Sequence, residues 1–210
     1  VFGFVPLQNQ LASLLQGVDV VFASAYDWDP HLHLDNDEFE TKFGQEIIKS
    51  CELAQVKHIV WSSLNHVRSG AATASGASQE TSRKLKKPVV ETPESFESKK
   101  KLEELLTNSS SLNWTILYSG FFMDNFQKFT PFEQVDGGKF VLKALPYLHK
   151  STVLPLFHVT DMGKIVQSLL LATIQNYSHL KLCLYAEKKN LSDVMNEFAR
   201  IIHADTVSLE

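Results

Sequence analysis

FESKKKLEELL at residues 96–106 and LNWTILYSG at residues 112–120 decide the fold that we predict for this chain. The first stretch carries apolar residues at helical spacing, and the second is a continuous apolar run as long as one strand. A glycine closes the strand, where the missing side chain permits a sharp turn. A helix followed by a buried strand is typical of parallel sheets, which bind ligands at the carboxyl ends of their strands.

Strands and helices alternate along the rest of the chain. Apolar spacing and capping residues predict helices over residues 11–15, 38–53, 92–106, 160–170 and 192–202, the last two capped by Thr160 and Ser192. Short apolar runs predict strands over residues 18–24, 58–63, 112–119, 139–142, 153–159 and 181–186. Polar segments at 26–37 and 65–92 are predicted loops. The alternation indicates an α/β fold with a parallel sheet covered by helices on both faces. Gly44, inside a predicted helix, suggests a close approach to a neighbouring strand.

The composition excludes several classes of protein. A net charge of −4 over 210 residues gives no basic surface of the kind that binds nucleic acid. Two cysteines, far apart, indicate a reduced intracellular compartment rather than a disulfide-built secreted fold. The apolar runs are well short of the roughly 20 residues that a spanning helix needs. We therefore expect a cytoplasmic or also nuclear protein that binds neither nucleic acid nor membrane.

Serines stand where two of the predicted strands end. Ser24 closes the strand at 18–24, and Ser62 and Ser63 close the strand at 58–63. Hydroxyl groups at this edge of a parallel sheet can bond the ribose or phosphate oxygens of a nucleotide. The alternative, which spacing alone favours, is that each serine only caps a strand end or a turn.

Lys99 is a candidate site residue on the helix predicted over 92–106. It begins a run of three lysines, and only one of them can face a given site because successive helix positions point about 100° apart. Phe96, Leu102 and Leu105 mark the predicted buried stripe, and Lys99 lies three residues from the first two. This spacing selects Lys99, although a solvated helix face is the alternative for all three.

The turn after the third of these strands carries glycine and paired aromatic residues. Gly120, Phe121 and Phe122 could wall a pocket for a nicotinamide or a substrate, and Met123 and Asn125 follow closely. The alternative for this turn is a plain hydrophobic plug.

Other chemistries find little support in the sequence. His31 and His33 stand among aspartates, but no third ligand follows at helical spacing, so we predict a solvated acidic loop and no metal site. The sequence has no G-x-S-x-G nucleophile motif. Three isolated histidines are predicted to be structural: His58, His158 and His203.

Five segments, taken in order, make the chain resemble the NmrA-like family of atypical short-chain dehydrogenase/reductases. They are LQGVDVVF at 15–22, VKHIVWSSL at 56–64 with Gly44 ahead of it, FESK at 96–99, GFFMDNF at 120–126 and HVTDMG at 158–163. None of these motifs is decisive alone, whereas five in the family's order are specific.

The resemblance implies a Rossmann-like parallel sheet with helices on both faces and a small C-terminal lobe. It divides the chain into an incomplete NAD(P)-binding domain at residues 1–136 and a substrate or partner lobe at 137–210, with one strand of that lobe returning to the main sheet. The implied cofactor is NADP or NAD. The implied cofactor-binding residues are Ser24, Ser62, Ser63, Lys99, Gly120, Phe121 and Phe122.

The same resemblance assigns the remaining roles. Lys99 is the implied catalytic residue, placed near the nicotinamide ribose. Phe122, Met123 and Asn125 are the implied substrate-binding residues. Ser95 stands four residues before Lys99, where short-chain reductases usually carry a tyrosine acid.

The opening β-α-β unit of the family, with its G-x-x-G-x-x-G loop, is expected ahead of residue 1. Residues 1–4 then align with the family's third strand. We interpret the chain as truncated at its N-terminus, either as a fragment of a longer protein or as a truncated paralogue.

Three functions follow from this reading. The first is an NAD(P)-dependent oxidoreductase that acts on a small metabolite. The second is a non-catalytic NAD(P)-sensing regulator that binds a protein partner such as a transcription factor, favoured by the missing tyrosine and by basic residues at 83–87. The third is an inactive truncated paralogue. The substrate, the choice between NADH and NADPH, and the oligomeric state stay open.

Overall fold

The structure is a computed structural model that describes residues 8–24, 36–64, 94–128, 132–135, 139–142, 149–203 and 206–209. Its helices are α1 (Gln8–Leu14), α2 (Asn36–Leu53), α3 (Glu94–Thr107), α4 (Asn125–Lys128), α5 (Val159–Leu171), the 3-10 helix η3 (Ile174–Asn176) and α6 (Leu191–Ile202). Its strands are β1 (Val20–Ser24), β2 (His58–Ser63), β3 (Asn113–Ser119), β4 (Phe121–Phe122), β5 (Phe132–Val135), β6 (Lys139–Leu142), β7 (Val153–Phe157), β8 (Leu180–Leu184), β9 (Glu187–Asn190) and β10 (Thr206–Leu209).

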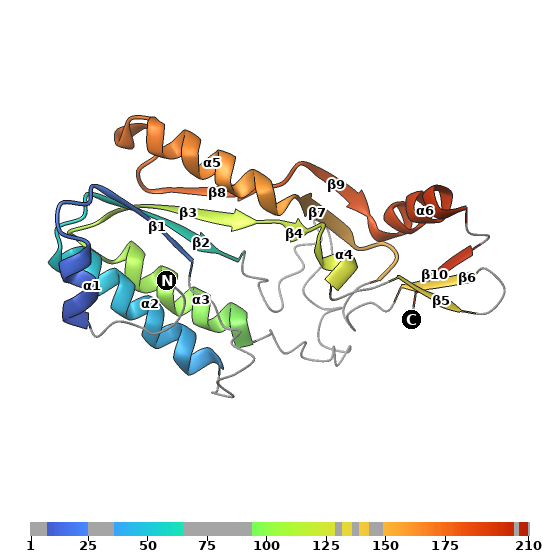
Figure 1. Ribbon diagram of the computed structural model, residues 1–210, viewed down its shortest axis with the longest axis horizontal. Helices are drawn as coiled ribbons and strands as arrows, with labels where there is room; N and C mark the ends of the chain where they lie inside the picture. Colours follow the sequence, from blue (N-terminus) through green and yellow to red (C-terminus); the bar gives the residue numbers. More distant parts are fainter. Residues whose placement is uncertain are drawn as a thin grey trace, which may run out of the picture.

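A four-stranded sheet in the order β1-β2-β3-β8 forms the main body, and each neighbouring pair is parallel (Figure 1). Helices α1, α2 and α3 lie on one face of this sheet, and α5 lies on the other. The α/β fold with helices on both faces is therefore confirmed. The strand predicted over 181–186 is β8, which adds to the main sheet beside β3.

Side chains of the central strands alternate between two hydrophobic clusters. Trp61 and Ile116 pack toward α2 and α3, whereas Val60 and Leu117 pack toward α5. Both faces are covered, so β2 and β3 are almost continuously buried. This burial explains why their sequences lack the polar alternation of a half-exposed strand.

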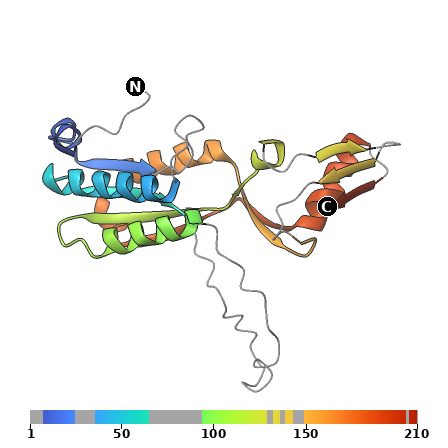
Figure 2. The same ribbon diagram turned by 90° about the horizontal axis from the view of Figure 1, so that it is seen from below.

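Two smaller sheets follow the main one. Strands β4, β7 and β9 form the first, and β10, β6 and β5 form the second, which lies beside α6 (Figure 2). Phe132 of β5 stacks on Phe198 of α6 with ring centroids 3.6 Å apart. The domain boundary predicted between residues 136 and 137 stays a prediction.

Several predicted details of the helices were wrong. Helix α5 is capped by His158 rather than Thr160, since the imidazole accepts the Thr160 N–H. Helix α6 begins at Leu191 with Asn190 as its N-cap, so Ser192 lies inside the helix and does not cap it. The Ser192 N–H donates to the Lys150 carbonyl. On α3, Leu105 is 44% exposed, and Leu106 is the buried residue.

The glycine inside α2 meets a helix and not a strand. A Cβ atom on Gly44 would lie 2.5 Å from a methyl carbon of Leu102, on α3. The missing side chain therefore permits the close approach of α2 to α3, where the sequence suggested a strand.

Some predictions lie outside the described residues. They concern the acidic loop with His31 and His33, the segment 65–92, the helix start at Thr92 and Pro93, and the opening residues 1–4. Within the described part of the chain, no helix is long and apolar enough to cross a membrane.

Candidate functional site

Two accessible hydroxyl groups lie side by side at the carboxyl edge of the main sheet. Ser24 of β1 and Ser62 of β2 are register partners. Ser24 is exposed, and Ser62 is half-buried. Side chains alternate along a strand, so both hydroxyls lie on the α5 face of the sheet, the face toward which Val20 and Val60 pack.

Ser63 does not share this position. Its side chain lies on the opposite face, is buried, and donates a hydrogen bond of 2.5 Å to Glu103 on α3. The cofactor-binding role predicted for Ser63 therefore finds no support in the geometry, because its hydroxyl belongs to the core.

Lys99 is held by a buried carboxylate on the neighbouring helix. Glu40 of α2 has no exposed surface, and it accepts hydrogen bonds from both Ser98 and Lys99. The Lys99 side chain is 13% exposed, whereas Lys100 and Lys101 are exposed. A buried carboxylate is stable only when charges and hydrogen bonds compensate its lost hydration. Of the three lysines, the structure thus points Lys99 inward, as its spacing predicted.

A second buried carboxylate stands one turn further along α3. Glu103 accepts hydrogen bonds from Ser63 on β2 and from Tyr118 on β3, the latter at 2.7 Å, and it pairs with Lys181 on β8 at 3.2 Å. Burial and the hydrogen bond to Glu103 raise the pKa of Tyr118 well above its usual range. Tyr118 therefore keeps its proton and serves as a structural donor rather than as an acid for the sheet edge.

The glycine-aromatic turn is fixed at both ends. The Gly120 N–H donates to the Leu184 carbonyl at 2.8 Å, and a Cβ atom on Gly120 would lie 2.1 Å from the Pro155 carbonyl oxygen. Only glycine permits this approach of β7 to the turn. Further along, the Met123 N–H donates to the Phe157 carbonyl at 2.9 Å.

The side chains of this turn divide between core and edge. Phe121 and Met123 pack against the cluster that contains Leu142 and Leu191, as the hydrophobic-plug alternative predicts. Phe122 is half-buried and lies opposite Phe157 of β7, with ring centroids 6.0 Å apart. Asn125 is half-buried and opens α4.

His58 is a structural residue, as predicted. Thr115 donates to the Tyr177 carbonyl at 2.6 Å, so it accepts the hydrogen bond from Nε2–H of His58 at 2.9 Å. Burial, with a smaller contribution from His179, lowers the pKa of His58 to about 4.

Sequence reasoning missed the two carboxylates that organise this region. Glu103 carried a usable signal, because it lies four residues after Lys99 and between the buried Leu102 and Leu106. The sequence signal for Glu40 was weaker, because its partners Ser98 and Lys99 are 58 and 59 residues away along the chain. Among the described residues, no group of histidine, cysteine and acidic side chains could hold a metal ion.

The family model described as the NmrA-like family matches residues 6–206. This chain belongs to the NmrA-like family. A comparison with curated proteins gave no match.

Solved structures share the fold of this NmrA-like chain at low sequence identity. NmrA, a negative transcriptional regulator in complex with NADP, is 16% identical with a TM-score of 0.70, over 97% of this chain and 56% of its own length. An NADPH-dependent quinone oxidoreductase from Escherichia coli is 15% identical with a TM-score of 0.67, and the match covers 97% of this chain and 58% of the oxidoreductase. Triphenylmethane reductase from Citrobacter sp., complexed with NADP(H), is 11% identical with a TM-score of 0.64, and the match covers 99% of this chain and 61% of the reductase. The NmrA-like chain thus spans less than two thirds of these relatives' length.

The described residues fit the ribose end of a nicotinamide nucleotide. Ser24 and Ser62 offer adjacent hydroxyls on the α5 face of the sheet. Lys99 lies on α3, which covers the opposite face, and its ammonium group is paired with Glu40. Ribose hydroxyls are suitable hydrogen-bond partners for the two serine hydroxyls. The 210 residues contain no G-x-x-G-x-x-G loop to hold the pyrophosphate, so the fit concerns the ribose end alone.

Proposed function

We propose that this NmrA-like chain is an NAD(P)-dependent oxidoreductase, or a fragment of one, that acts on a small metabolite. The observation that carries the proposal is the register pair of Ser24 and Ser62, two accessible hydroxyls at the carboxyl edge of a parallel sheet. Ligands of open α/β sheets bind at this edge. The fold that the chain shares with dinucleotide-bound NmrA and with two reductases supports it further.

Each residue has a distinct part in this proposal. Ser24 and Ser62 bond ribose hydroxyls, and Lys99 orients the ribose from a position that Glu40 fixes. The nicotinamide nucleotide, when bound, supplies a hydride. The Tyr118 hydroxyl donates its hydrogen bond to Glu103 and does not serve as a proton donor to a substrate. A hydride acceptor that needs no acid from the protein therefore fits best. Quinones and conjugated cationic dyes are such acceptors, because solvent water can supply the proton after the hydride has arrived.

The test uses the 210-residue chain and two lysine variants. NADPH and NADH are titrated by calorimetry into the wild type, Lys99→Ala and Lys100→Ala. A hydrogen bond to a charged group is worth about 1.5 to 3 kcal/mol, so Lys99→Ala should weaken binding by roughly tenfold or more. Lys100 is exposed one position away and should be neutral. Equal affinity in all three proteins would remove the role assigned to Lys99.

Turnover is a separate arm of the same experiment. NADPH oxidation is followed with 1,4-naphthoquinone and with a triphenylmethane dye as acceptors. Oxidation that depends on the protein and on an acceptor supports the oxidoreductase.

A second candidate is an NAD(P)-sensing regulator that binds a protein partner such as a transcription factor. The burial of Tyr118 against Glu103 favours it, since a nucleotide site without a protein acid can serve sensing alone. Nucleotide binding without oxidation by either acceptor, together with partner capture that changes between NADP and NADPH, would support this candidate. An inactive paralogue would bind neither nucleotide.

A further inference from the structure

A groove of about 590 Å³ lies between the C-terminal half of α2 and the end of α3, and we call it the α2–α3 groove. Its lining includes Glu46, Ile48, Lys49 and Glu52 of α2, with Leu105 of α3 and Ser109 just after it. Both helices cover the same face of the main sheet and finish at the same end of it (Figure 1). The groove is therefore on the face opposite to α5 and away from the hydroxyls of Ser24 and Ser62.

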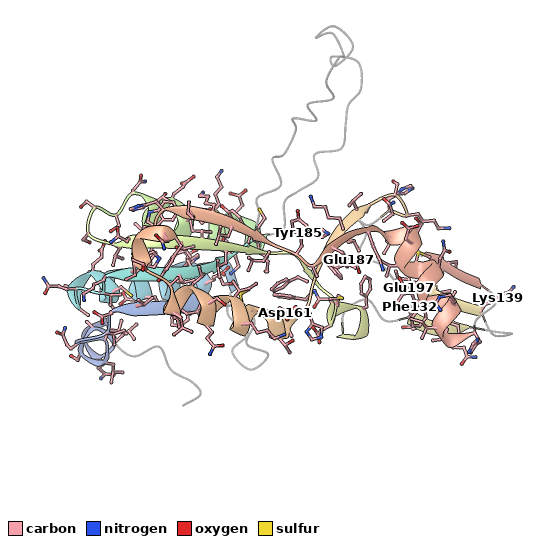
Figure 3. All side chains as sticks on the ribbon, turned by 90° about the horizontal axis from the view of Figure 1, so that it is seen from above. Phe132, Lys139, Asp161, Tyr185, Glu187 and Glu197 are labelled. Carbon is pink, nitrogen blue, oxygen red and sulfur yellow. The ribbon has the colours of Figure 1, made fainter. Side chains whose placement is uncertain are left out.

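The two helix ends beside this groove are electronegative. Aligned peptide dipoles place a partial negative charge at a helix C-terminus, and basic side chains near that end stabilise it. Neither α2 nor α3 carries a basic residue in its last turn, and each has a glutamate there instead, Glu52 and Glu104. Helix α6, on which Figure 3 labels Glu197, shows the usual arrangement, with Arg200 in its last turn. The α2–α3 groove thus lies beside two helix ends whose negative charge has no basic side chain from the same helix turn.

Glu46 adds an unpaired carboxylate to the α2–α3 groove. Its Oε2 atom is shielded from solvent and has no hydrogen-bond partner. Lys49 also lines the groove, but it is exposed and makes no ion pair with Glu46 or Glu52 within the described part of the chain. Glu52 differs from Glu46, because its Oε1 accepts a hydrogen bond from the Ser109 hydroxyl at 2.6 Å. A carboxylate oxygen out of water without a donor is costly, and a bound cation would remove that cost.

Apolar surface lies beside these carboxylates. Leu105 lines the α2–α3 groove and is 44% exposed, and the buried Ile48 lines it from α2. An aliphatic chain can cover such a surface while the charged group at its end reaches a carboxylate. The lining therefore matches a cation that is carried on an aliphatic stem.

We propose that the α2–α3 groove binds a guanidinium group on an aliphatic chain, as in the arginine side chain of a protein or in a small guanidine. A guanidinium has five N–H donors in one plane, so it can bond Oε2 of Glu46 and further acceptors at the helix ends together. It is also more weakly hydrated than an ammonium group, so it loses less when it leaves water. This binding function is separate from the proposed nucleotide site on the other face of the sheet.

Glu46→Gln tests the proposal with little change of shape. The variant removes the charge, and its melting temperature should not fall, because within the described part of the chain Glu46 makes no hydrogen bond or ion pair. Glu104→Gln is the matched control. It removes the same charge from an exposed residue of α3 that does not line the groove.

Binding is measured by ¹H–¹⁵N NMR, from the shifts of the backbone amides of residues 108–110, which line the groove. The ligands are N-acetyl-arginine N-methylamide and its neutral isostere N-acetyl-citrulline N-methylamide. We expect saturable binding of the arginine amide to the wild type and to Glu104→Gln, and no saturable binding of the citrulline amide. Glu46→Gln should bind the arginine amide roughly tenfold or more weakly, because a hydrogen bond between charged groups is lost.

Butylguanidine, which carries the same cation without peptide groups, separates the two sources of the ligand. Tighter binding of butylguanidine assigns the groove to a small guanidine, and tighter binding of the arginine amide assigns it to an arginine of a protein partner. Equal affinities for the arginine and citrulline amides overturn the proposal. Equal affinity of wild type and Glu46→Gln, or no saturable shift in the wild type, overturns it as well.

Discussion

Glu40 on α2 and Lys99 on α3 form an ion pair whose carboxylate has no exposed surface. Ser98 donates a second hydrogen bond to the same carboxylate. The paired residues are 59 positions apart in sequence, and their contact joins α2 to α3 and orients the lysine that the family resemblance singled out. The position of the candidate site residue is thus set by a partner from another helix.

Removal of Glu40 should destabilise the fold strongly. Glu40→Ala removes the buried carboxylate that Lys99 and Ser98 bond, and breaking a buried pair costs about 3 kcal/mol or more. Glu104→Ala, at an exposed position of α3, should change the free energy of unfolding by less than about 0.5 kcal/mol. Urea unfolding of both variants measures the difference. Similar midpoints for the two variants would show that the pair does not hold the helices together.

Two helical glycines should respond to alanine in opposite directions. In Gly44→Ala the new Cβ atom meets Leu102, which is buried, so overpacking should cost about 1 to 3 kcal/mol. In Gly163→Ala nothing lies within 4 Å of the new atom, so the gain in helix propensity should stabilise α5 by up to about 1 kcal/mol. Thermal unfolding of the two variants checks the sign. A stabilising Gly44→Ala would contradict the close packing of α2 on α3.

Lowering the pH should reduce the free energy of unfolding, because His58 takes up a proton more readily in the unfolded chain than in the folded protein. Its pKa is about 4 in the folded protein against 6.5 for the free group, so the unfolded chain binds more protons between these values. Stability is therefore full above about pH 6.5 and falls as the pH drops toward 4, by on the order of 3 kcal/mol. Urea unfolding at several pH values should show this loss in the wild type and in His203→Gln, an exposed control. His58→Gln should show a smaller loss, and an equal one would refute the assignment.

Tyr118 should matter for stability and not for nucleotide binding. Tyr118→Phe removes the donor to Glu103, a hydrogen bond to a buried acid worth about 1.5 to 3 kcal/mol. Tyr185→Phe, at an exposed position, should be nearly neutral. Calorimetric titration of NADPH should give the same affinity for wild type and Tyr118→Phe. A large loss of affinity in Tyr118→Phe alone would instead place this phenol in the nucleotide site.

Regular elements of the core could be predicted from sequence because their apolar pattern is local. The bounds of β2 and β6 agree with prediction, and helical spacing selected the inward-facing lysine on α3. Strand β4 has two residues, too few for any period to appear. Strand β9 reads EKKN, a polar segment that pairs with β7, and its Lys189 pairs with Glu197 of α6.

The candidate site was harder to predict than the fold. Ser62 and Ser63 are adjacent and chemically identical, yet one lies at the edge and the other in the core. Which serine faces which side depends on the register of the whole sheet. The same holds for Glu40, whose role exists only once α2 packs on α3.

Calorimetric titration of NADPH into the double variant Ser24→Ala/Ser62→Ala tests the central claim most directly. Ser168→Ala, whose hydroxyl bonds the Lys164 carbonyl within α5, is the control for the loss of an exposed serine. We predict that the wild type and Ser168→Ala bind NADPH alike and that the double variant binds at least about tenfold more weakly with an unchanged melting temperature. Equal affinity in all three proteins, or no binding by the wild type, would contradict a nucleotide site at the carboxyl edge of the main sheet.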